Sequence, residues 1–144
     1  MLFAGATMWF TTSIGKPANT PLLVISTLVK GDDAMMNGSA SAPVGLALHM
    51  ALSVLFGAVF VALVSRLRTN GALAFAGLVY GGLLYIVNFQ ILGRAAFHAF
   101  LMPDQPFEVV VHLVFGALLA LASFNSGIRR GGRLLGGLRG VEPR

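Results

Sequence analysis

The sequence predicts an all-α integral membrane protein, a bundle of four transmembrane helices with a short interfacial helix between the first and the second. The chain has 144 residues, of which 56% are hydrophobic and only 10% are charged, whereas soluble domains carry roughly 25% charged residues. A chain of this size cannot bury so much apolar surface in its own core. Three apolar runs are also long enough to cross the hydrocarbon of a bilayer, which takes about 20 helical residues. Lipid is therefore the expected solvent.

The first predicted span covers residues 1–15 and is the shortest. Its sequence, MLFAGATMWFTTSIG, is apolar and ends before Lys16. A helix of that length reaches about 22 Å, so it crosses a bilayer only where the bilayer thins. A secretory signal peptide would begin with a charged segment, and this apolar run does not follow one. We therefore expect a first membrane helix rather than a signal peptide.

A short helix is predicted at residues 20–30, within the stretch NTPLLVISTLVKG. Pro21 suits the first turn of a helix, where its missing N–H group costs no hydrogen bond. The apolar run from this proline to Val29 is too short to span a bilayer. It is therefore expected to lie at the membrane interface or to re-enter the membrane from one side.

The remaining spans are predicted at residues 43–65, 71–93 and 106–125, and with the first they form a bundle over residues 1–126. Trp9 and the phenylalanines are expected to anchor this bundle at the interface and to contact lipid. The last segment, residues 127–144, is rich in glycine and arginine. Glycine weakens a helix by about 1 kcal/mol per residue, so we expect a basic tail that lies on anionic headgroups or docks on a partner subunit.

The distribution of lysine and arginine orients the predicted helices. Loops on the cytoplasmic side of a membrane carry an excess of these residues. If the four spans begin in the cytoplasm, the inner side holds seven basic residues: Arg66, Arg68, Arg129, Arg130, Arg133, Arg139 and Arg144. The outer side then holds three, which are Lys16, Lys30 and Arg94. The protein is accordingly placed in a bacterial inner membrane, with both termini in the cytoplasm.

The composition argues against several functional classes. The absence of cysteine excludes disulfide exchange, thiolate catalysis and cysteine-ligated metals. The net charge of +5 does not indicate a nucleic-acid partner, because five of the ten basic residues lie in the last sixteen positions without aromatic residues among them. The sequence has no phosphate-binding glycine loop with a lysine. No span carries an acid away from its ends, which disfavours proton-coupled export.

Two histidines occupy similar positions in different spans. His49 ends the stretch PVGLALH and His112 ends the stretch PFEVVVH, each six residues after a proline that opens a span. In the predicted topology both helices run from the outer to the inner side, so each ring lies ~9 Å below the outer boundary. The two rings are therefore expected at the same depth.

Small residues indicate which way these histidines face. The residues that follow at four-residue intervals are Ser53 and Gly57 after the first histidine, and Gly116 and Ala120 after the second. Residues four apart share a helix face, and small residues mark the face where another membrane helix approaches. Both rings are therefore expected to face protein rather than lipid. The GxxxG pair Gly77 and Gly81 predicts a similar close approach for the third span.

Further polar side chains gather at the predicted outer end of the bundle. They are Tyr85, Asn88, Gln90 and Arg94 at the end of the third span, His98 and Asp104 in the following loop, and Glu108 four residues before His112. A polar group without a partner in hydrocarbon costs several kcal/mol. The cluster is therefore expected to be hydrogen-bonded internally or to bind a ligand.

Four interpretations of this region remain open. The plainest is an interhelical network, in which each histidine bonds a backbone carbonyl group or a neighbouring polar side chain. The second is a b-type haem with His49 and His112 as axial ligands, because histidine is a common haem ligand and facing helices at one depth provide the geometry. The third is a divalent metal bound by His112, Glu108 and His98. The fourth is a proton relay or a contact with a quinone.

These features predict a small accessory or scaffolding subunit of a larger bacterial inner-membrane complex, with a respiratory or other electron-transfer complex as the expected host. The soluble parts are tiny, the helices carry small-residue faces, and no catalytic constellation is recognised, so an enzyme is not expected. The expected partners are membrane lipids and other membrane subunits or further copies of the chain. The alternatives are a haem-binding redox protein and a small-solute channel or carrier, although the inner halves of the spans show no polar path.

Overall fold

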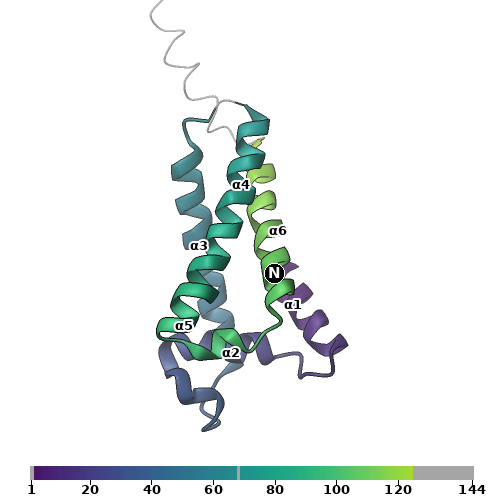
Figure 1. The fold of residues 1–144 in the computed structure, drawn as a ribbon, viewed down its shortest axis with the longest axis vertical. Coiled ribbons are helices and arrows are strands. Elements are labelled where there is room, and N and C mark those ends of the chain that lie inside the picture. Colours follow the sequence, from purple (N-terminus) through teal and green to yellow (C-terminus); the bar gives the residue numbers. More distant parts are fainter. Residues whose placement is uncertain (1, 68, 125–144) are drawn as a thin grey trace, which may run out of the picture.

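The computed structural model describes residues 2–67 and 69–124, and every regular element in these ranges is a helix. Figure 1 shows three long helices side by side, with shorter elements gathered at one end. The elements are α1 (Leu2–Ser13), α2 (Thr20–Lys30), η1 (Asp32–Met35), α3 (Ala42–Val64), α4 (Asn70–Tyr85), η2 (Ile86–Leu92), α5 (Gly93–Ala95), η3 (His98–Leu101) and α6 (Gln105–Phe124). The predicted all-helical fold is confirmed. Arg68 and the predicted tail at residues 127–144 lie outside the described residues.

Three helices are long and apolar enough to cross a membrane. They are Ala42–Val64, Asn70–Ala95 and Gln105–Phe124, with 23, 26 and 20 residues. The second of these, the middle span, consists of α4, η2 and α5. Their outward faces carry large exposed apolar side chains such as Val54, Leu63 and Phe75. Because a helix satisfies its own backbone hydrogen bonds, these faces can contact lipid without leaving polar groups unpaired.

The first predicted span is not confirmed as a span. α1 has 12 residues, so it is about 18 Å long and shorter than the ~30 Å hydrocarbon layer. It packs against the beginning of α6, where the rings of Phe10 and Phe107 stack with their centroids 3.8 Å apart. Figure 1 shows α1 beside the half of α6 that is nearer to α2. Three helices therefore meet the length of a span, and the predicted count of four is not confirmed.

α2 lies across the end of the bundle (Figure 1), and its bounds agree with the short helix predicted at residues 20–30. It has Pro21 in its first turn and ends at Gly31. Gly31 has φ 91° and ψ 158°, a conformation that is essentially restricted to glycine. The buried face of α2 packs on α3 at Gly45, where a Cβ atom would overlap the carbonyl oxygen of Leu22. α2 thereby closes one end of the space between the long helices.

α4 and α6 form the most extensive helix pair. A Cβ atom added to Gly77 or Gly116 would overlap the carbonyl oxygen of the other, and one added to Gly81 would overlap the carbonyl oxygen of His112. Ala120 lies 2.9 Å from the position that a Cβ atom at Gly77 would take. Because neither helix carries bulk here, the two backbones come into direct contact. The close approach predicted from the small-residue spacing is confirmed for these residues.

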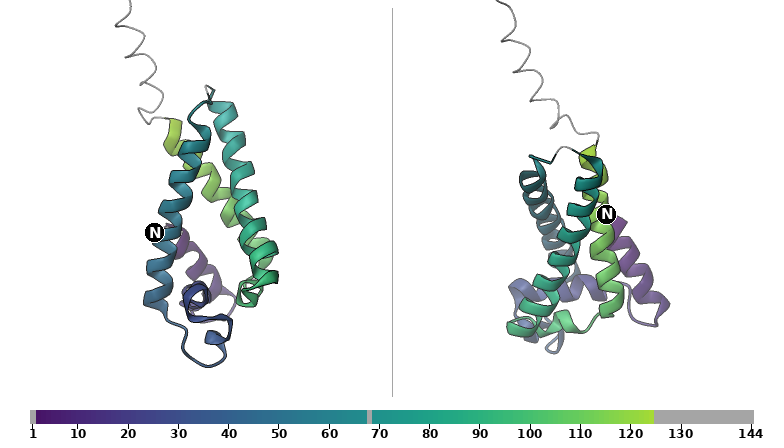
Figure 2. Two further views of the ribbon diagram at one scale, coloured as in Figure 1. Left: turned by 90° about the vertical axis from the view of Figure 1, so that its left-hand side faces the viewer. Right: turned by 45° about the horizontal axis from the view of Figure 1, so that its top comes forward.

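α3 joins this pair mainly near the α3–α4 loop. The buried core there consists of Phe60, Val64, Leu73 and Ala120. The Tyr80 hydroxyl donates to the Phe56 carbonyl oxygen at 2.8 Å and so ties α4 to α3. Toward the α2 end the two helices diverge (Figure 2, left). Gly57 of α3 meets the Leu119 side chain at 3.6 Å, an ordinary contact, so the close approach expected at this glycine is not seen.

The middle span changes from α-helix to π-helix at the end where α3 and α4 diverge. Residues Ile86–Leu92 form a π-helix, in which the N–H group of Gly93 bonds to the carbonyl oxygen of Asn88. π-Helical turns occur frequently at functional sites. The side chains of Asn88 and Phe89, both within this segment, line the space between the helices.

Several phenylalanines are buried rather than facing lipid. Phe60, Phe89 and Phe100 all belong to buried cores. The rings of Phe89 and Phe100 pack edge to face with their centroids 5.6 Å apart, next to Val24 of α2. The prediction of lipid contact is therefore wrong for these three rings, whereas Trp9 is exposed as expected.

Candidate functional site

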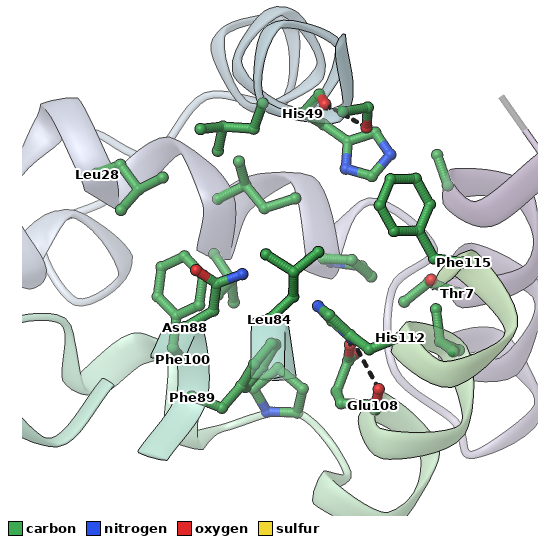
Figure 3. A pocket seen from close by; sticks show the side chains of 18 of the residues that line it. Thr7, Leu28, His49, Leu84, Asn88, Phe89, Phe100, Glu108, His112 and Phe115 are labelled. Carbon is green, nitrogen blue, oxygen red and sulfur yellow. Dashed lines mark hydrogen bonds and ion pairs between the residues drawn. The ribbon is translucent and has the colours of Figure 1, made fainter. Parts of the chain in front are cut away.

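A partly open cavity lies between α3, the middle span, α6 and α2, in the half of the bundle nearest α2 (Figure 3). Its volume is about 160 Å³, similar to an engineered apolar cavity of about 150 Å³ that binds benzene. Its aromatic wall residues are Phe56, Phe89, Phe97, Phe100 and Phe115. Its polar wall residues are Thr7, His49, Ser53, Asn88, Glu108 and His112.

Both histidines singled out by the sequence lie on the wall of this one cavity. His49 projects from α3 and His112 projects from α6, and both rings point inward (Figure 3). Exposed residues of α3, such as Val54, lie on a different face of the helix. The inward orientation predicted from the small-residue spacing is therefore seen for both rings.

The hydrogen bond of His112 determines which ring nitrogen remains available. Its Nδ1 atom lies 2.7 Å from the backbone carbonyl oxygen of Glu108. A carbonyl oxygen only accepts hydrogen bonds, so Nδ1 carries the hydrogen, and in the neutral imidazole Nε2 then keeps a lone pair. A carboxyl oxygen of Glu108 lies 3.8 Å from the same Nδ1 atom, on a residue that is only 7% exposed. Nε2 faces the cavity as a hydrogen-bond acceptor (Figure 3).

His49 and Asn88 present further polar groups to the cavity. Neither side chain forms a hydrogen bond with any residue in the described ranges 2–67 and 69–124. Ser53 differs, because its hydroxyl donates to the backbone carbonyl oxygen of His49 at 2.7 Å and is satisfied within α3. Every fully buried side-chain nitrogen and oxygen of the described residues has a partner, so the unpaired imidazole and amide atoms are accessible from the cavity and can bond a molecule held there.

The polar cluster predicted from the sequence does not form one site. Asn88 and Glu108 line the cavity, whereas Arg94 is exposed on the surface. Tyr85 does not line the cavity, and its hydroxyl donates to the side-chain oxygen of Gln105 at 3.2 Å. This bond connects the middle span to the first turn of α6. The expected network, in which each histidine bonds a backbone carbonyl group or a polar side chain, is seen only in part. His112 bonds the Glu108 carbonyl oxygen within its own helix, whereas His49 has no such partner among the described residues.

His98 and Asp104 serve the loops at the α2 end. Nδ1 of His98 lies 2.9 Å from a carboxylate oxygen of Asp32, and the other oxygen accepts from the N–H group of Ala99 at 3.0 Å. The Ala99 hydrogen bond is the main cause that holds the pKa of Asp32 below its ordinary value, and His98 adds to the effect. Asp104 accepts from the N–H group of Phe107 at 2.9 Å and so caps the first turn of α6.

A divalent metal bound by His112, Glu108 and His98 is not supported. His98 pairs with Asp32 in the loops and does not line the cavity. Within the part of the chain that the structure describes, no three metal-ligating side chains come together. The three residues are close in sequence, but the turn between η3 and α6 separates His98 from Glu108 and His112.

The aromatic wall is the part of the site that the sequence does not reveal. The ring of His112 packs edge-on against Phe89 with the centroids 5.3 Å apart, and Phe56 and Phe115 add further rings. Residue type gives no indication, because phenylalanine is equally expected at lipid-facing positions. Spacing offers a weak one, since Phe56 follows His49 by seven residues and Phe115 follows His112 by three, which places each pair on one helix face.

No protein-family model, curated protein or solved structure matches this chain. A function for this chain is therefore inferred from the chemistry of the cavity alone. An apolar cavity with a few polar groups is typical of small-molecule sites. No lysine or arginine of the described residues lines it, so it favours neutral ligands over anions.

Proposed function

We propose that the protein is a non-catalytic accessory subunit of a larger bacterial inner-membrane assembly, and that it holds a small, largely apolar ligand in the cavity beside α3 and α6. The observation that supports the proposal is the cavity itself, which three polar groups face without a protein partner in the described residues: His49, Asn88 and Nε2 of His112. A respiratory or other electron-transfer complex is the proposed host.

The energetics of the cavity favour a bound molecule. Every fully buried side-chain nitrogen and oxygen of the described residues has a partner, so the three unpaired groups are accessible from the cavity. A ligand can bond them in place of water, at a net value of about 0.5–1.5 kcal/mol per hydrogen bond. The aromatic wall adds dispersion contacts, which an empty cavity would lack. Water can satisfy the polar groups, but it makes no comparable contact with the rings.

The exposed apolar surface of α3 is compatible with packing against other membrane subunits. In α3 the buried residues are Gly45, Phe60 and Val64, so most of the helix remains available to lipid or to helices of other subunits. The hydroxyl of Ser53, one helical turn from His49, donates to the His49 backbone carbonyl oxygen rather than to the imidazole ring. These features support a binding role rather than a catalytic one.

The proposed orientation places the α3–α4 loop and the C-terminus in the cytoplasm. The cytoplasmic N-terminus predicted from the sequence would require α1 to be a fourth span, and its 12 residues are too few for that. The orientation is supported by the excess of arginine in the α3–α4 loop and near the C-terminus of the sequence. The α2 end, and the cavity with it, then lies in the outer half of the membrane. Because the chain has no cysteine, single introduced cysteines and a membrane-impermeant thiol reagent can test this. Labelling of a cysteine in the α3–α4 loop from outside the cell would contradict the orientation.

Two measurements test the proposed function. Blue native electrophoresis of mild-detergent extracts should show the protein within an assembly larger than itself, and native mass spectrometry should detect a small non-covalent ligand. Ser53→Phe, which fills the cavity from its wall, should lose the ligand, whereas Val54→Phe on the exposed face should keep it. A monodisperse monomer with turnover of its own would contradict the accessory role.

A b-type haem held by His49 and His112 is the second candidate, and one observation favours it. Metal-ligating histidines usually donate their other ring N–H group to a carbonyl or carboxylate, and His112 does so toward Glu108. The cavity of about 160 Å³ has room for a single small ring, so a porphyrin fits only if α3 moves away from the middle span. An absorption spectrum tests this candidate. A Soret band that vanishes in His49→Ala and His112→Ala would support haem, and a colourless protein would contradict it.

A small-solute channel or carrier is not proposed. The core of Phe60, Val64, Leu73 and Ala120 closes the bundle at the α3–α4 loop. The backbone contact between Gly77 and Gly116 closes the α4–α6 side. Among the described residues, the polar wall of the cavity belongs to the half of the spans nearest α2, and it does not continue through the bundle.

A further inference from the structure

We infer that the ligand of this cavity is a neutral aromatic ring that bears hydroxyl groups, which is the chemistry of a membrane hydroquinone headgroup. This inference rests on the proposed ligand-binding function and adds the chemical class of the ligand. Three independent properties of the cavity lead to it: its size and aromatic wall, the tautomer of His112, and the absence of a cation among the described wall residues.

The size and the wall indicate a single aromatic ring. A cavity of about 160 Å³ is comparable to one that accepts benzene. Phe89 of η2 and Phe115 of α6 face it (Figure 3), and Phe56 of α3 also lines it. Aromatic rings gain from stacked or edge-to-face contacts beyond their buried area. Because the cavity is only partly enclosed, an apolar tail attached to the ring can extend outward into lipid.

The hydrogen-bonding groups indicate a ligand that donates. Nε2 of His112 is an acceptor, because Nδ1 already donates to the carbonyl group of Glu108. A hydroxyl group donates to such a nitrogen, whereas the carbonyl oxygen of an oxidised quinone can only accept and cannot pair with it. The amide of Asn88 and the imidazole of His49 each offer a donor and an acceptor, so either can bond a second hydroxyl group.

The charge of the wall indicates a neutral ligand. A phosphate or a fatty-acid carboxylate needs a cationic partner when it leaves water. No lysine or arginine of the described residues lines the cavity, and the Glu108 carboxyl group does. Anionic lipid headgroups and fatty acids are therefore disfavoured. Phenolic hydroxyl groups satisfy the polar wall without adding a buried charge.

The middle span supports this assignment. Asn88 and Phe89, one hydrogen-bonding group and one wall ring, both belong to the π-helical segment Ile86–Leu92. A π-helical turn gives up regular α-helical hydrogen bonding and is found frequently at functional sites. Here it brings an amide and a ring to the same cavity from adjacent positions.

Three small molecules test the inference: hydroquinone, para-xylene and 1,4-dimethoxybenzene. Para-xylene has the shape of hydroquinone with methyl groups in place of the hydroxyl groups, and dimethoxybenzene carries acceptors but no donors. Dissociation constants are measured by ligand-observed NMR on the full chain in quinone-free detergent, for the wild type and for His112→Leu. Comparing the two proteins cancels the partition of each ligand into detergent.

His112→Leu should weaken hydroquinone binding by about five- to tenfold, the value of one hydrogen bond. It should leave the affinities of para-xylene and dimethoxybenzene unchanged within about twofold, because neither donates to Nε2. His98→Leu is the matched control, since His98 does not line the cavity, and it should not change hydroquinone binding. Should His112→Leu fail to fold, Asn88→Leu tests the hydroxyl assignment by comparing hydroquinone with para-xylene alone, because the amide can also donate to the ether oxygens of dimethoxybenzene.

The outcomes separate the ligand class from the binding function. If hydroquinone and para-xylene lose affinity equally in His112→Leu, the hydroxyl assignment is overturned while the cavity still binds ligands. If dimethoxybenzene loses as much as hydroquinone, the acceptor role of Nε2 is overturned. If none of the three binds the wild type, the proposed ligand-holding function fails together with the inference.

Discussion

The backbone contact between α4 and α6 makes a sharp prediction at two neighbouring glycines. Gly81→Ala should destabilise the bundle, and Gly82→Ala should leave it unchanged or slightly more stable. A Cβ atom at Gly81 would overlap the carbonyl oxygen of His112 and lie 2.9 Å from its carbonyl carbon, and backbone atoms cannot rotate aside. At Gly82 the nearest atom is Cδ2 of Leu113 at 3.7 Å, an ordinary contact.

The magnitude follows from the difference between these two variants. Each substitution gains up to about 1 kcal/mol of helix propensity, and that gain cancels in the comparison. Forcing an extra carbon into a packed contact typically costs about 1–3 kcal/mol. Gly81→Ala is therefore expected to be about 1–3 kcal/mol less stable than Gly82→Ala, where about 1.4 kcal/mol is a tenfold change in the folding equilibrium.

Reversible unfolding in mixed micelles provides the assay. Both variants are titrated with increasing amounts of a denaturing detergent in the same lipid–detergent mixture, and the loss of structure is followed by circular dichroism. The free energy of unfolding is compared between the two. Equal stability of Gly81→Ala and Gly82→Ala would refute the idea that direct backbone contact sets the separation of α4 and α6.

Three further predictions concern the attachments of the bundle. Tyr80→Phe removes the hydrogen bond to the Phe56 carbonyl group and should cost about 0.6 kcal/mol. It should also widen the separation of α3 from α4 in spin-label distance measurements on introduced cysteines, and an unchanged distance would count against it. Gly31→Ala should cost about 1–3 kcal/mol in thermal unfolding, because the residue holds a conformation that is essentially glycine-only; a variant as stable as the wild type would contradict this. The lowered pKa of Asp32 means that the folded state binds the proton more weakly than the unfolded state. Its bond to Ala99 should therefore stabilise the loops above the ordinary value of 3.8 and weaken as pH falls through the lowered folded-state pKa. Hydrogen exchange of the Ala99 amide should show this acid dependence, and Asp32→Asn should abolish it.

The elements that the sequence predicts well depend on properties of one helix at a time. The length and apolarity of residues 42–64 and 105–124 are sufficient to identify spans. Small residues on one face predict a close approach at Gly77, Gly81 and Gly116, because the face of a helix follows from its period alone. Gly57 shows the limit of that logic. It has the same spacing, but α3 diverges from its neighbours and the glycine meets only a side chain.

The elements that the sequence does not predict depend on contacts between distant segments. His98 is close to Glu108 in sequence, yet it pairs with Asp32, 66 positions away, because the loops at the α2 end fold together. The aromatic wall combines rings such as Phe56 and Phe115 from separate helices, so no single segment contains its pattern. α1 is largely apolar, but it has only 12 residues and is therefore too short to count as a span.

The protonation of the two ring nitrogens of His112 tests most directly whether the cavity offers an unpaired hydrogen-bond acceptor. Solid-state nitrogen NMR of the histidine-labelled protein in lipid bilayers, at a pH where imidazole is neutral, distinguishes a protonated from an unprotonated nitrogen. We expect a protonated Nδ1 and an unprotonated Nε2, and a shift of the Nε2 resonance when hydroquinone is added. A protonated Nε2, or an Nε2 resonance that hydroquinone does not move, would contradict this account of the site.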